Sequence, residues 1–228
     1  MKYLNYFTAF EKILWISSAS VIIVTFFMQD GGGILSLAAS LIGVTFLIFN
    51  AKGNPIGQLL TIVFSILYGF ISYSFAYYGE MVTYLGMTAP MALLALISWL
   101  RNPYKGNKSQ VQVNRVSKKE IFFMLILTAA VTAVFYFILS ALKTANIVPS
   151  VISVTTSFLA VYLTFRRSPY FALAYASNDM VLIILWAMAS VKDKNYVSVL
   201  ICFMVFLVND LYGFINWKRM EKNQSEQT

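Results

Sequence analysis

Two amide–carboxylate pairs stand inside apolar stretches near the carboxyl end of the chain. They are Asn178-Asp179 and Asn209-Asp210. An Asp at the centre of a membrane span costs roughly 2.5–3.5 kcal/mol on insertion scales, so such residues mark cavities by default. An amide beside a carboxylate can bind the hydroxyl groups or a ring nitrogen of a polar solute. The alternative is a hydrogen bond that only holds two helices together.

Polar residues also follow one face of the stretch 56–77. They recur at steps of three and four residues and therefore share one side of a helix: Gln58, Thr61, Ser65, Tyr68 and Ser72. We expect this face to line a polar path, although Ser and Thr also form small-residue packing faces. The last apolar stretch offers a second polar face, made of Asn209, Tyr212 and Asn216.

Aromatic residues that share faces or neighbourhoods with these polar groups complete the candidate site. They are Tyr68, Tyr84, Tyr175, Trp186 and Tyr212. Aromatic faces beside carboxylates suit a flat, polar ring that carries a sugar, and a cationic ring would gain from both groups. Aromatic residues make up 16% of the chain, so most of them must serve packing instead.

These residues are carried by apolar stretches that predict an all-α membrane protein. At about 1.5 Å rise per residue, most of the stretches can cross a hydrocarbon core roughly 30 Å thick. We place eight of them, at 13–28, 34–49, 56–77, 82–100, 121–142, 149–165, 170–190 and 196–216. The first resembles a signal peptide in length, but Gln29-Asp30-Gly31 is a poor cleavage site, so we expect a helix there.

The positive charge falls in alternate gaps between the stretches. One set of gaps holds fourteen basic residues, namely Lys2, Lys12, Lys52, Arg101, Lys105, Lys108, Arg115, Lys118, Lys119, Arg166, Arg167, Lys218, Arg219 and Lys222. The other set holds three, Lys143, Lys192 and Lys194. This bias predicts a multi-pass protein of a bacterial inner membrane with both termini inside. The net charge of +8 therefore indicates topology and anionic-lipid contact, and not nucleic-acid binding.

Several chemistries are excluded by what the chain lacks. It has no His, which removes His-based zinc sites, His proton relays and Ser–His catalysis. The single Cys202 cannot form an intrachain disulfide. We find no nucleotide-binding motif and no metal-ligand spacing, so we expect that the protein binds no cofactor and is not an enzyme. An intramembrane lipid-modifying transferase is a remote alternative, and an ion channel is another; saturable flux would separate a carrier from a channel.

The polar segment 102–120 divides the chain into two halves, and the helices of both halves end in similar residues. In each half the first helix ends in a basic turn with proline, at Lys52–Pro55 and Arg166–Pro169, and the third ends at a tryptophan, Trp99 or Trp217. Small residues recur on the first helices, at Ser36, Ser40, Gly43 and at Ser153, Ser157, Ala160. We predict two parallel three-helix repeats related by an axis along the membrane normal, with the substrate between them. The segments are an extra helix in 1–30, repeats in 31–101 and 146–217, a basic loop and linker helix in 102–145, and a cytoplasmic tail in 218–228.

Three stretches resemble the PnuC family of vitamin and nucleoside transporters. They are YGEMVTYLGMTAP (78–90), YFALAYASNDMVLIILW (170–186) and LVNDLYGFINW (207–217). The resemblance implies a three-plus-one-plus-three architecture like a full-length SWEET transporter, and a homotrimer. It also implies facilitated diffusion of nicotinamide riboside, which a cytoplasmic kinase then traps by phosphorylation. The extra helix resembles one found in some members.

Within this resemblance, positions matching the family pattern are Gly79-Glu80, Pro90, Asp179, Asn209, Tyr212-Gly213 and Asn216-Trp217. Three features depart from it. Ala172 and Tyr175 replace tryptophans, Tyr84 replaces an asparagine, and Asn178 and Asp210 are additions. A pocket with more amide and carboxylate groups also suits a purine or pyrimidine deoxynucleoside, and other branches of the family take thiamine or riboflavin. Nicotinamide riboside is therefore the leading substrate and a deoxynucleoside the first alternative.

Overall fold

The computed structural model describes residues 6–28, 33–74, 78–144, 146–192, 194 and 197–227. In this part of the chain, the predicted stretches form eight segments long and apolar enough to cross a membrane. Seven are single helices: α1 (Ala9–Met28), α2 (Ile34–Ala51), α3 (Pro55–Ser74), α6 (Lys118–Ala141), α7 (Ile147–Phe165), α8 (Tyr170–Lys192) and α9 (Val197–Glu226). The helical membrane protein expected from the sequence is confirmed. Residues 75–77 and 196 of the predicted stretches, and Lys2, lie outside the described residues.

The remaining segment, which is the fourth along the chain, is interrupted. It begins at Tyr78, four residues before the predicted 82–100, and consists of α4 (Tyr78–Thr83), the π-helix η1 (Tyr84–Thr88) and α5 (Ala89–Arg101). Pro90 lies at the start of α5 and has no backbone N–H to donate to the preceding turn. A wider π turn before the proline accommodates the missing bond. The interruption matters because Tyr84 and its neighbours line the cavity described below.

Two of the polar regions, the carboxyl-terminal segment and the loop after α5, contain regular secondary structure. The helix α9 extends through most of the predicted tail 218–228, as far as Glu226. Its last turns are fixed by Gln224, whose side-chain oxygen accepts from the N–H of Val113 at 2.8 Å and whose nitrogen donates to the carbonyl of Val111 at 3.1 Å. The loop after α5 contains a hairpin, β1 (Pro103–Tyr104) and β2 (Asn107–Val111), so the protein is not purely helical.

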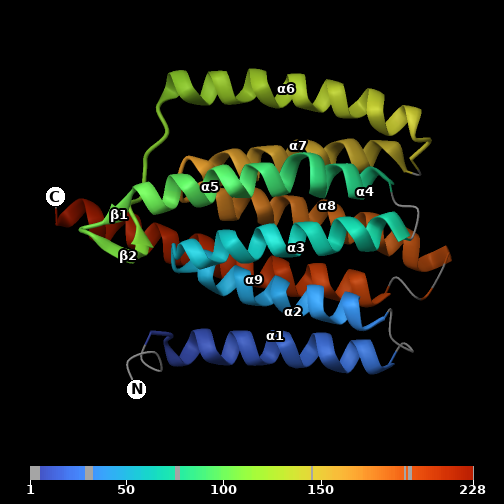
Figure 1. Cartoon of the computed structure of the whole chain (residues 1–228), viewed down its shortest axis with the longest axis horizontal. Coiled ribbons are helices and arrows are strands. Elements are labelled where there is room, and N and C mark those ends of the chain that lie inside the picture. Colours follow the sequence, from blue (N-terminus) through green and yellow to red (C-terminus); the bar gives the residue numbers. More distant parts are fainter. Residues whose placement is uncertain are drawn as a thin grey trace.

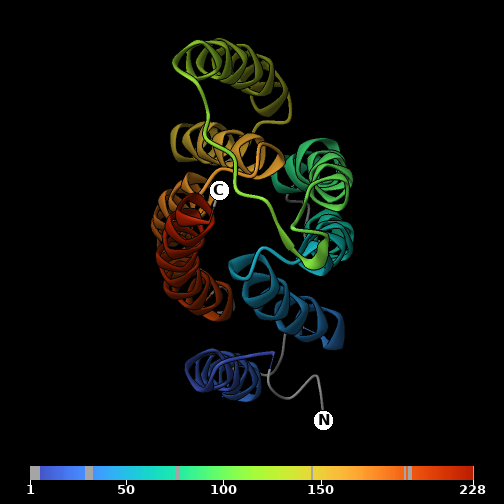
Figure 2. The same cartoon turned by 90° about the vertical axis from the view of Figure 1, so that its left-hand side faces the viewer.

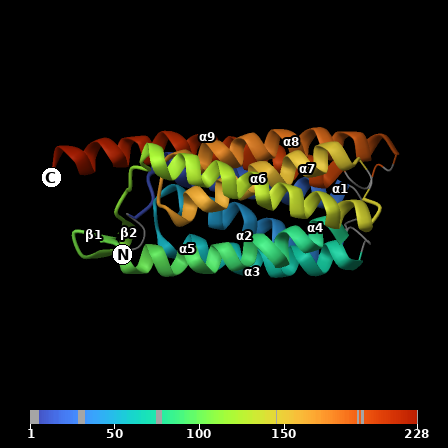
Figure 3. The same cartoon turned by 90° about the horizontal axis from the view of Figure 1, so that it is seen from above.

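The helices form an elongated bundle with α6 along one edge and α1 along the opposite edge (Figure 1). Between these edges, α2, α3 and α5 lie on one side and α8 and α9 on the other (Figure 2). The helix α2 packs on α3 and α9, and α7 packs on α8 and α5, so each half contacts the other along two seams. Seen from above, the last turns of α9 project beyond the end of the bundle (Figure 3).

Two tryptophans join the halves in the same way. The indole Nε1 of Trp99, in α5, donates to the carbonyl of Thr164, near the end of α7, at 2.9 Å. The indole Nε1 of Trp217, in α9, donates to the carbonyl of Asn50, near the end of α2, at 2.7 Å. Both indoles are fully buried, so these bonds replace water as partners of the carbonyls. The matching tryptophans seen in the sequence thus occupy matching structural positions.

The side chain of the residue before each tryptophan also donates a hydrogen bond, to the backbone carbonyl that follows the one bound by the indole. Ser98 Oγ donates to the carbonyl of Phe165 at 2.9 Å, and Asn216 Nδ2 donates to the carbonyl of Ala51 at 2.8 Å. Each of the two helix ends therefore has two carbonyls bound by the other half. Such bonds satisfy groups that a helix terminus otherwise leaves without a partner.

The linker between the halves contacts both of these helix ends. The N–H of Val111 donates to the carbonyl of Gly53 at 2.9 Å, and the N–H of Asn114 donates to the carbonyl of Arg167 at 3.0 Å. Gly53 and Arg167 follow α2 and α7 at corresponding positions and both have left-handed φ angles, 65° and 57°. This conformation ends a helix and is easiest for glycine. The linker thus holds the two turns together from one side.

The helix α1 bridges α2 and α9 from outside the bundle. The carboxylate of Glu11, only 1% exposed, pairs with Lys52 Nζ at 3.1 Å and accepts from the hydroxyl of Tyr212 at 2.8 Å. Further along, Asn209 Nδ2 donates to Ser18 Oγ at 3.0 Å. Because these partners belong to both halves, α1 ties them along one seam.

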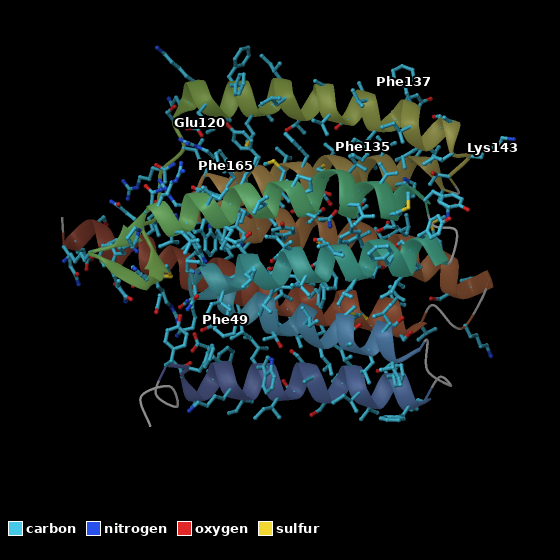
Figure 4. All side chains as sticks on the ribbon, in the orientation of Figure 1. Phe49, Glu120, Phe135, Phe137, Lys143 and Phe165 are labelled. Carbon is cyan, nitrogen blue, oxygen red and sulfur yellow. The ribbon has the colours of Figure 1, made fainter. Side chains whose placement is uncertain are left out.

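The helix α6 occupies the other edge. Its N-cap is Ser117, whose Oγ accepts from the N–H of Glu120 at 3.3 Å, and the Glu120 carboxylate pairs with Arg166. Phe135 packs toward α7, whereas Phe137 points away from the bundle and is 70% exposed (Figure 4). An exposed apolar face of this kind suits contact with lipid.

Candidate functional site

A buried cavity lies between the two halves. It is lined from α2 and α3 by Phe46, Leu47, Asn50, Thr61 and Phe64; from α4 and η1 by Glu80, Thr83, Tyr84 and Thr88; and from α7, α8 and α9 by Ser153, Ser157, Phe171, Tyr175, Asn178, Asp179, Leu182, Phe203, Phe206 and Asp210. The residues therefore come from six of the membrane segments, with α4 and η1 counted as one, and from both halves of the chain. A concave site with an apolar wall and a few convergent polar groups is typical of small-molecule binding.

Half of the predicted site residues line this cavity. They are Thr61, Glu80, Tyr84, Tyr175, Asn178, Asp179 and Asp210. The two amide–carboxylate pairs contribute three of these seven, and the polar stripe of 56–77 contributes one. The remaining predicted residues lie elsewhere, and their contacts show why.

The polar stripe on α3 faces α2 and its own helix more than the cavity. Gln58 Nε2 donates to Asn50 Oδ1 at 2.8 Å, and Ser65 Oγ donates to the carbonyl of Thr61 at 2.8 Å. Tyr68 packs against Phe64 and Tyr84 with ring centroids 5.5 and 4.6 Å apart. Gln58, Ser65 and Tyr68 thus contact neighbouring residues of α2, α3 and η1 and are not part of the cavity lining.

The polar face of the last helix is also divided. Asn209 and Tyr212 bind α1, and Asn216 binds the end of α2, as described above. Trp186 is buried in the apolar core outside the cavity lining. None of these three polar residues lines the cavity, whereas Asp210 does so together with Phe203 and Phe206 of the same helix.

Two carboxyl groups meet in the cavity wall. Asp179 of α8 and Asp210 of α9 both line the cavity, and their side chains are 4% and 5% exposed. The Oδ2 atom of Asp179 is buried and has no hydrogen-bond partner among the described residues. A buried acceptor without a partner carries a desolvation cost, which a ligand donor would relieve.

Asn178 is held by three hydroxyl groups of α7. Ser153, Thr156 and Ser157 lie within 3.2, 2.9 and 3.0 Å of its Oδ1. They occupy one face of α7 because their spacing is three and one residues. This contact fixes the orientation of an amide that lines the cavity.

Aromatic rings close the cavity toward the basic loops. Phe171, which lines the cavity, packs against Trp217 with ring centroids 4.9 Å apart, and Trp217 packs against Trp99 at 5.4 Å. On another wall, Phe64 contacts Tyr84 and Phe206 at 5.9 and 6.0 Å. The polar groups are therefore enclosed by rings, which suits a flat solute.

Some lining residues were missed from the sequence. Phe171 lies one helical turn before Tyr175, so its spacing could have revealed it. Ser153 and Ser157 stood out only as small residues on a first helix. Asn50, Thr83 and Thr88 gave no sequence signal, because each is a single polar residue near a helix end or in an interrupted helix.

The cavity lining contains acidic side chains but no basic ones. Glu80, Asp179 and Asp210 are acidic, and no Lys or Arg belongs to the lining. Among the described residues, no group of three His, Cys, Asp or Glu side chains could hold a metal ion. The cavity as built is suited to a neutral or cationic organic solute.

Comparisons with known proteins identify relatives over most of the chain. A family model described as "Nicotinamide mononucleotide transporter" matches residues 33–219. The nicotinamide riboside transporter PnuC of Neisseria mucosa is 26% identical over 228 residues, covering 96% of this chain and 85% of that protein. The protein of the same name from Haemophilus influenzae is 19% identical over 216 residues, covering 92% and 91%.

A solved structure shows the same fold. The crystal structure of the vitamin B3 transporter PnuC matches with a TM-score of 0.82 and 23% identity, and the match covers 96% of this chain and 94% of that chain. The family match begins at residue 33, so it includes every helix that lines the cavity and excludes α1.

Proposed function

The chain belongs to the nicotinamide mononucleotide transporter family, and on that premise we propose that it carries nicotinamide riboside across the membrane. The observation that carries this proposal is the cavity lining, which combines aromatic faces with three carboxyl groups and no basic side chain. The pyridinium ring of the riboside is flat and positively charged, and both aromatic faces and carboxylates attract such a ring. The relatives named as nicotinamide riboside transporters support the same substrate.

The same charge pattern favours the riboside over its phosphorylated form. A phosphate group needs Arg, Lys or several backbone N–H donors as partners. Glu80, Asp179 and Asp210 are the ionisable acids of the lining, and none of them is such a partner. Phosphorylation by a cytoplasmic kinase would therefore trap the transported molecule, because the product no longer fits the cavity.

We further propose the three-plus-one-plus-three, SWEET-like arrangement, with α2, α3 and α4–α5 as one repeat and α7, α8 and α9 as the other. The reciprocal bonds of Trp99 and Trp217 support a two-fold relation between these repeats. In this arrangement, α6 is the linker helix and α1 the extra helix. Rocking of one repeat against the other would expose the cavity to either side. Pro55, Pro90 and Pro169 are the candidate bends.

The proposed mechanism is uniport by facilitated diffusion in a bacterial inner membrane, with both termini inside and three copies in the assembly. The test is uptake of labelled nicotinamide riboside into vesicles that contain the purified protein. We expect saturable uptake that stops when inside and outside concentrations are equal, and that continues without proton or sodium gradients. Accumulation above the outside concentration should require an enclosed kinase with ATP. Accumulation driven by an ion gradient alone would contradict uniport.

A deoxynucleoside is the second candidate substrate, with the same fold and mechanism. The observation in its favour is that Ala172, where a tryptophan was expected, is buried against α9 at Gly213 and does not line the cavity. The ring would then contact Phe171 and Tyr175 instead. Competition by deoxyadenosine, deoxyguanosine or thymidine in the uptake assay distinguishes this substrate, and thiamine and riboflavin complete the panel.

A further inference from the structure

The orientation of the Asn178 amide sets which hydrogen bonds the cavity offers. Its oxygen is within hydrogen-bond distance of three hydroxyl groups, from Ser153, Thr156 and Ser157. An amide oxygen accepts through two lone pairs, which the hydroxyls of Ser153 and Ser157 can fill by themselves, while the one O–H of Thr156 also lies within reach of the carbonyls of Ile152 and Ser153. The Nδ2 group, with its two N–H donors, has no hydrogen-bond partner among the described residues. Asn178 therefore presents a donor to the cavity.

The next residue presents the opposite group. Asp179 lines the same cavity, and its side chain is only 4% exposed. Its Oδ2 atom has no hydrogen-bond partner among the described residues. This atom is an acceptor. Successive positions of α8 thus place a donor and an acceptor on one wall.

We propose that Asn178 and Asp179 together recognise a primary carboxamide on the ring of the substrate, and that the site thereby rejects the corresponding ring carboxylate. A carboxamide has an oxygen that accepts and an NH₂ group that donates, so it matches the two side chains. The inference rests on the proposed function and adds to it: it assigns Asn178, Asp179 and the α7 hydroxyls to the choice between amide and acid.

The acid is rejected for two physical reasons. A carboxylate has no N–H to donate, so Asp179 Oδ2 stays unpartnered in a buried site. The added negative charge of the acid is also costly to bury, because no basic side chain in the lining offsets it. Sites that depend on a hydrogen bond reject analogues that lack it far more strongly than apolar pockets reject a changed shape.

The test compares binding of nicotinamide riboside and nicotinic acid riboside to the purified full-length protein by calorimetry. For the unmodified protein, we expect the acid to bind at least about 100-fold more weakly. Asp179→Asn replaces the carboxylate by an amide that can donate to the acid, and it should bring the two affinities to within about tenfold of each other. Asn178→Asp keeps the shape but removes both donors, and it should abolish binding of both ribosides.

The α7 hydroxyls are positioning residues, and a matched pair of neighbouring threonines tests them. Thr156→Val removes one of the groups that hold Asn178, whereas Thr155→Val removes a bond to Thr132 of α6, at 2.9 Å, outside the cavity. We expect Thr156→Val, alone or with Ser157→Ala, to lower the ratio of the two affinities by about tenfold, while Thr155→Val leaves it unchanged. A role in folding alone would lower both affinities in parallel.

The outcomes separate this inference from the proposed function. Equal binding of the two ribosides, or an unchanged ratio in Asp179→Asn, overturns the inference and leaves nicotinamide riboside as the substrate. If neither riboside binds while a deoxynucleoside does, both the substrate proposal and this inference fail. Melting curves show whether each variant is folded. If Thr156→Val is not folded, Ser153→Ala, which removes another of the three hydroxyl groups, takes its place.

Discussion

Adjacent residues of one helix serve different purposes in this protein. Asn209 and Asp210 follow one another in α9, yet Asn209 binds Ser18 of α1 and Asp210 lines the cavity. Consecutive helical residues are about 100° apart around the axis, so they face different neighbours. The pair Asn178-Asp179 differs, because both of its side chains line the cavity.

A glycine in α2 controls the shape of the cavity wall. The ring of Phe206, from α9, lies directly on Gly43, and a Cβ at Gly43 would overlap it. In Gly43→Ala we expect the ring to move into the cavity, since overpacking forces side chains to shift at a cost of about 1–3 kcal/mol. Binding of nicotinamide riboside, measured by calorimetry, should weaken about tenfold or more.

Gly86→Ala is the matched control for this substitution. Gly86 lies in η1, and the nearest atom to a Cβ there is Val82 Cγ1 at 3.8 Å, an ordinary contact. Its affinity should stay within about twofold of the unmodified protein. Equal losses in the two variants would show that helix propensity, and not the Phe206 contact, controls binding.

At the level of helices, the halves are joined by side chains bonded to the carbonyls of helix ends. The same donor type, an indole, occupies both seams, and the linker holds the two turns that follow α2 and α7. This arrangement closes the cavity toward the basic loops, so it must loosen when substrate passes on that side. The helix α1 adds a tie on the α2–α9 seam only.

Removing either indole N–H should destabilise the closed arrangement. Trp99→Phe and Trp217→Phe each leave a carbonyl with one partner fewer in a buried place, and we expect each to lower the free energy of unfolding by about 1–3 kcal/mol. Chemical denaturation of the purified protein measures this loss. Because the two rings touch, the double substitution should not be additive.

Trp15→Phe is the control for the indole substitutions. Trp15 Nε1 donates to Thr45 Oγ1 at 3.1 Å, but its side chain is 41% exposed on α1. Its loss should cost clearly less than that of the buried pair. A cost as large as that of Trp217→Phe would mean that general indole packing, and not the reciprocal bonds, stabilises the halves.

For the whole molecule, the distribution of charge agrees with one orientation in the membrane. The basic linker, the turns after α2 and α7 and the end of α9 lie at the same end of the bundle, where α1 also begins (Figure 1). Lys143 lies at the opposite end from Glu120 (Figure 4). On the positive-inside rule we propose that the linker lies in the cytoplasm.

Cysteine labelling in intact cells tests this orientation. In a Cys202→Ser background, which removes the one native thiol, Lys143→Cys should react with a membrane-impermeant maleimide. Lys108→Cys, on the exposed strand β2, should react only after the cells are permeabilised. The reverse pattern would place the linker outside and contradict the assignment.

The sequence alone determined the number of membrane helices, their approximate ends, the division by the basic linker and the polar residues that do not belong in lipid. These features follow from hydropathy and charge, which act locally along the chain. Only the tertiary structure decided that Thr61, Glu80 and Asp210 share one cavity, whereas Gln58, Asn209 and Asn216 bind neighbouring helices. Helical periodicity assigns residues to a face of their own helix, but which element lies opposite that face depends on how all the helices pack.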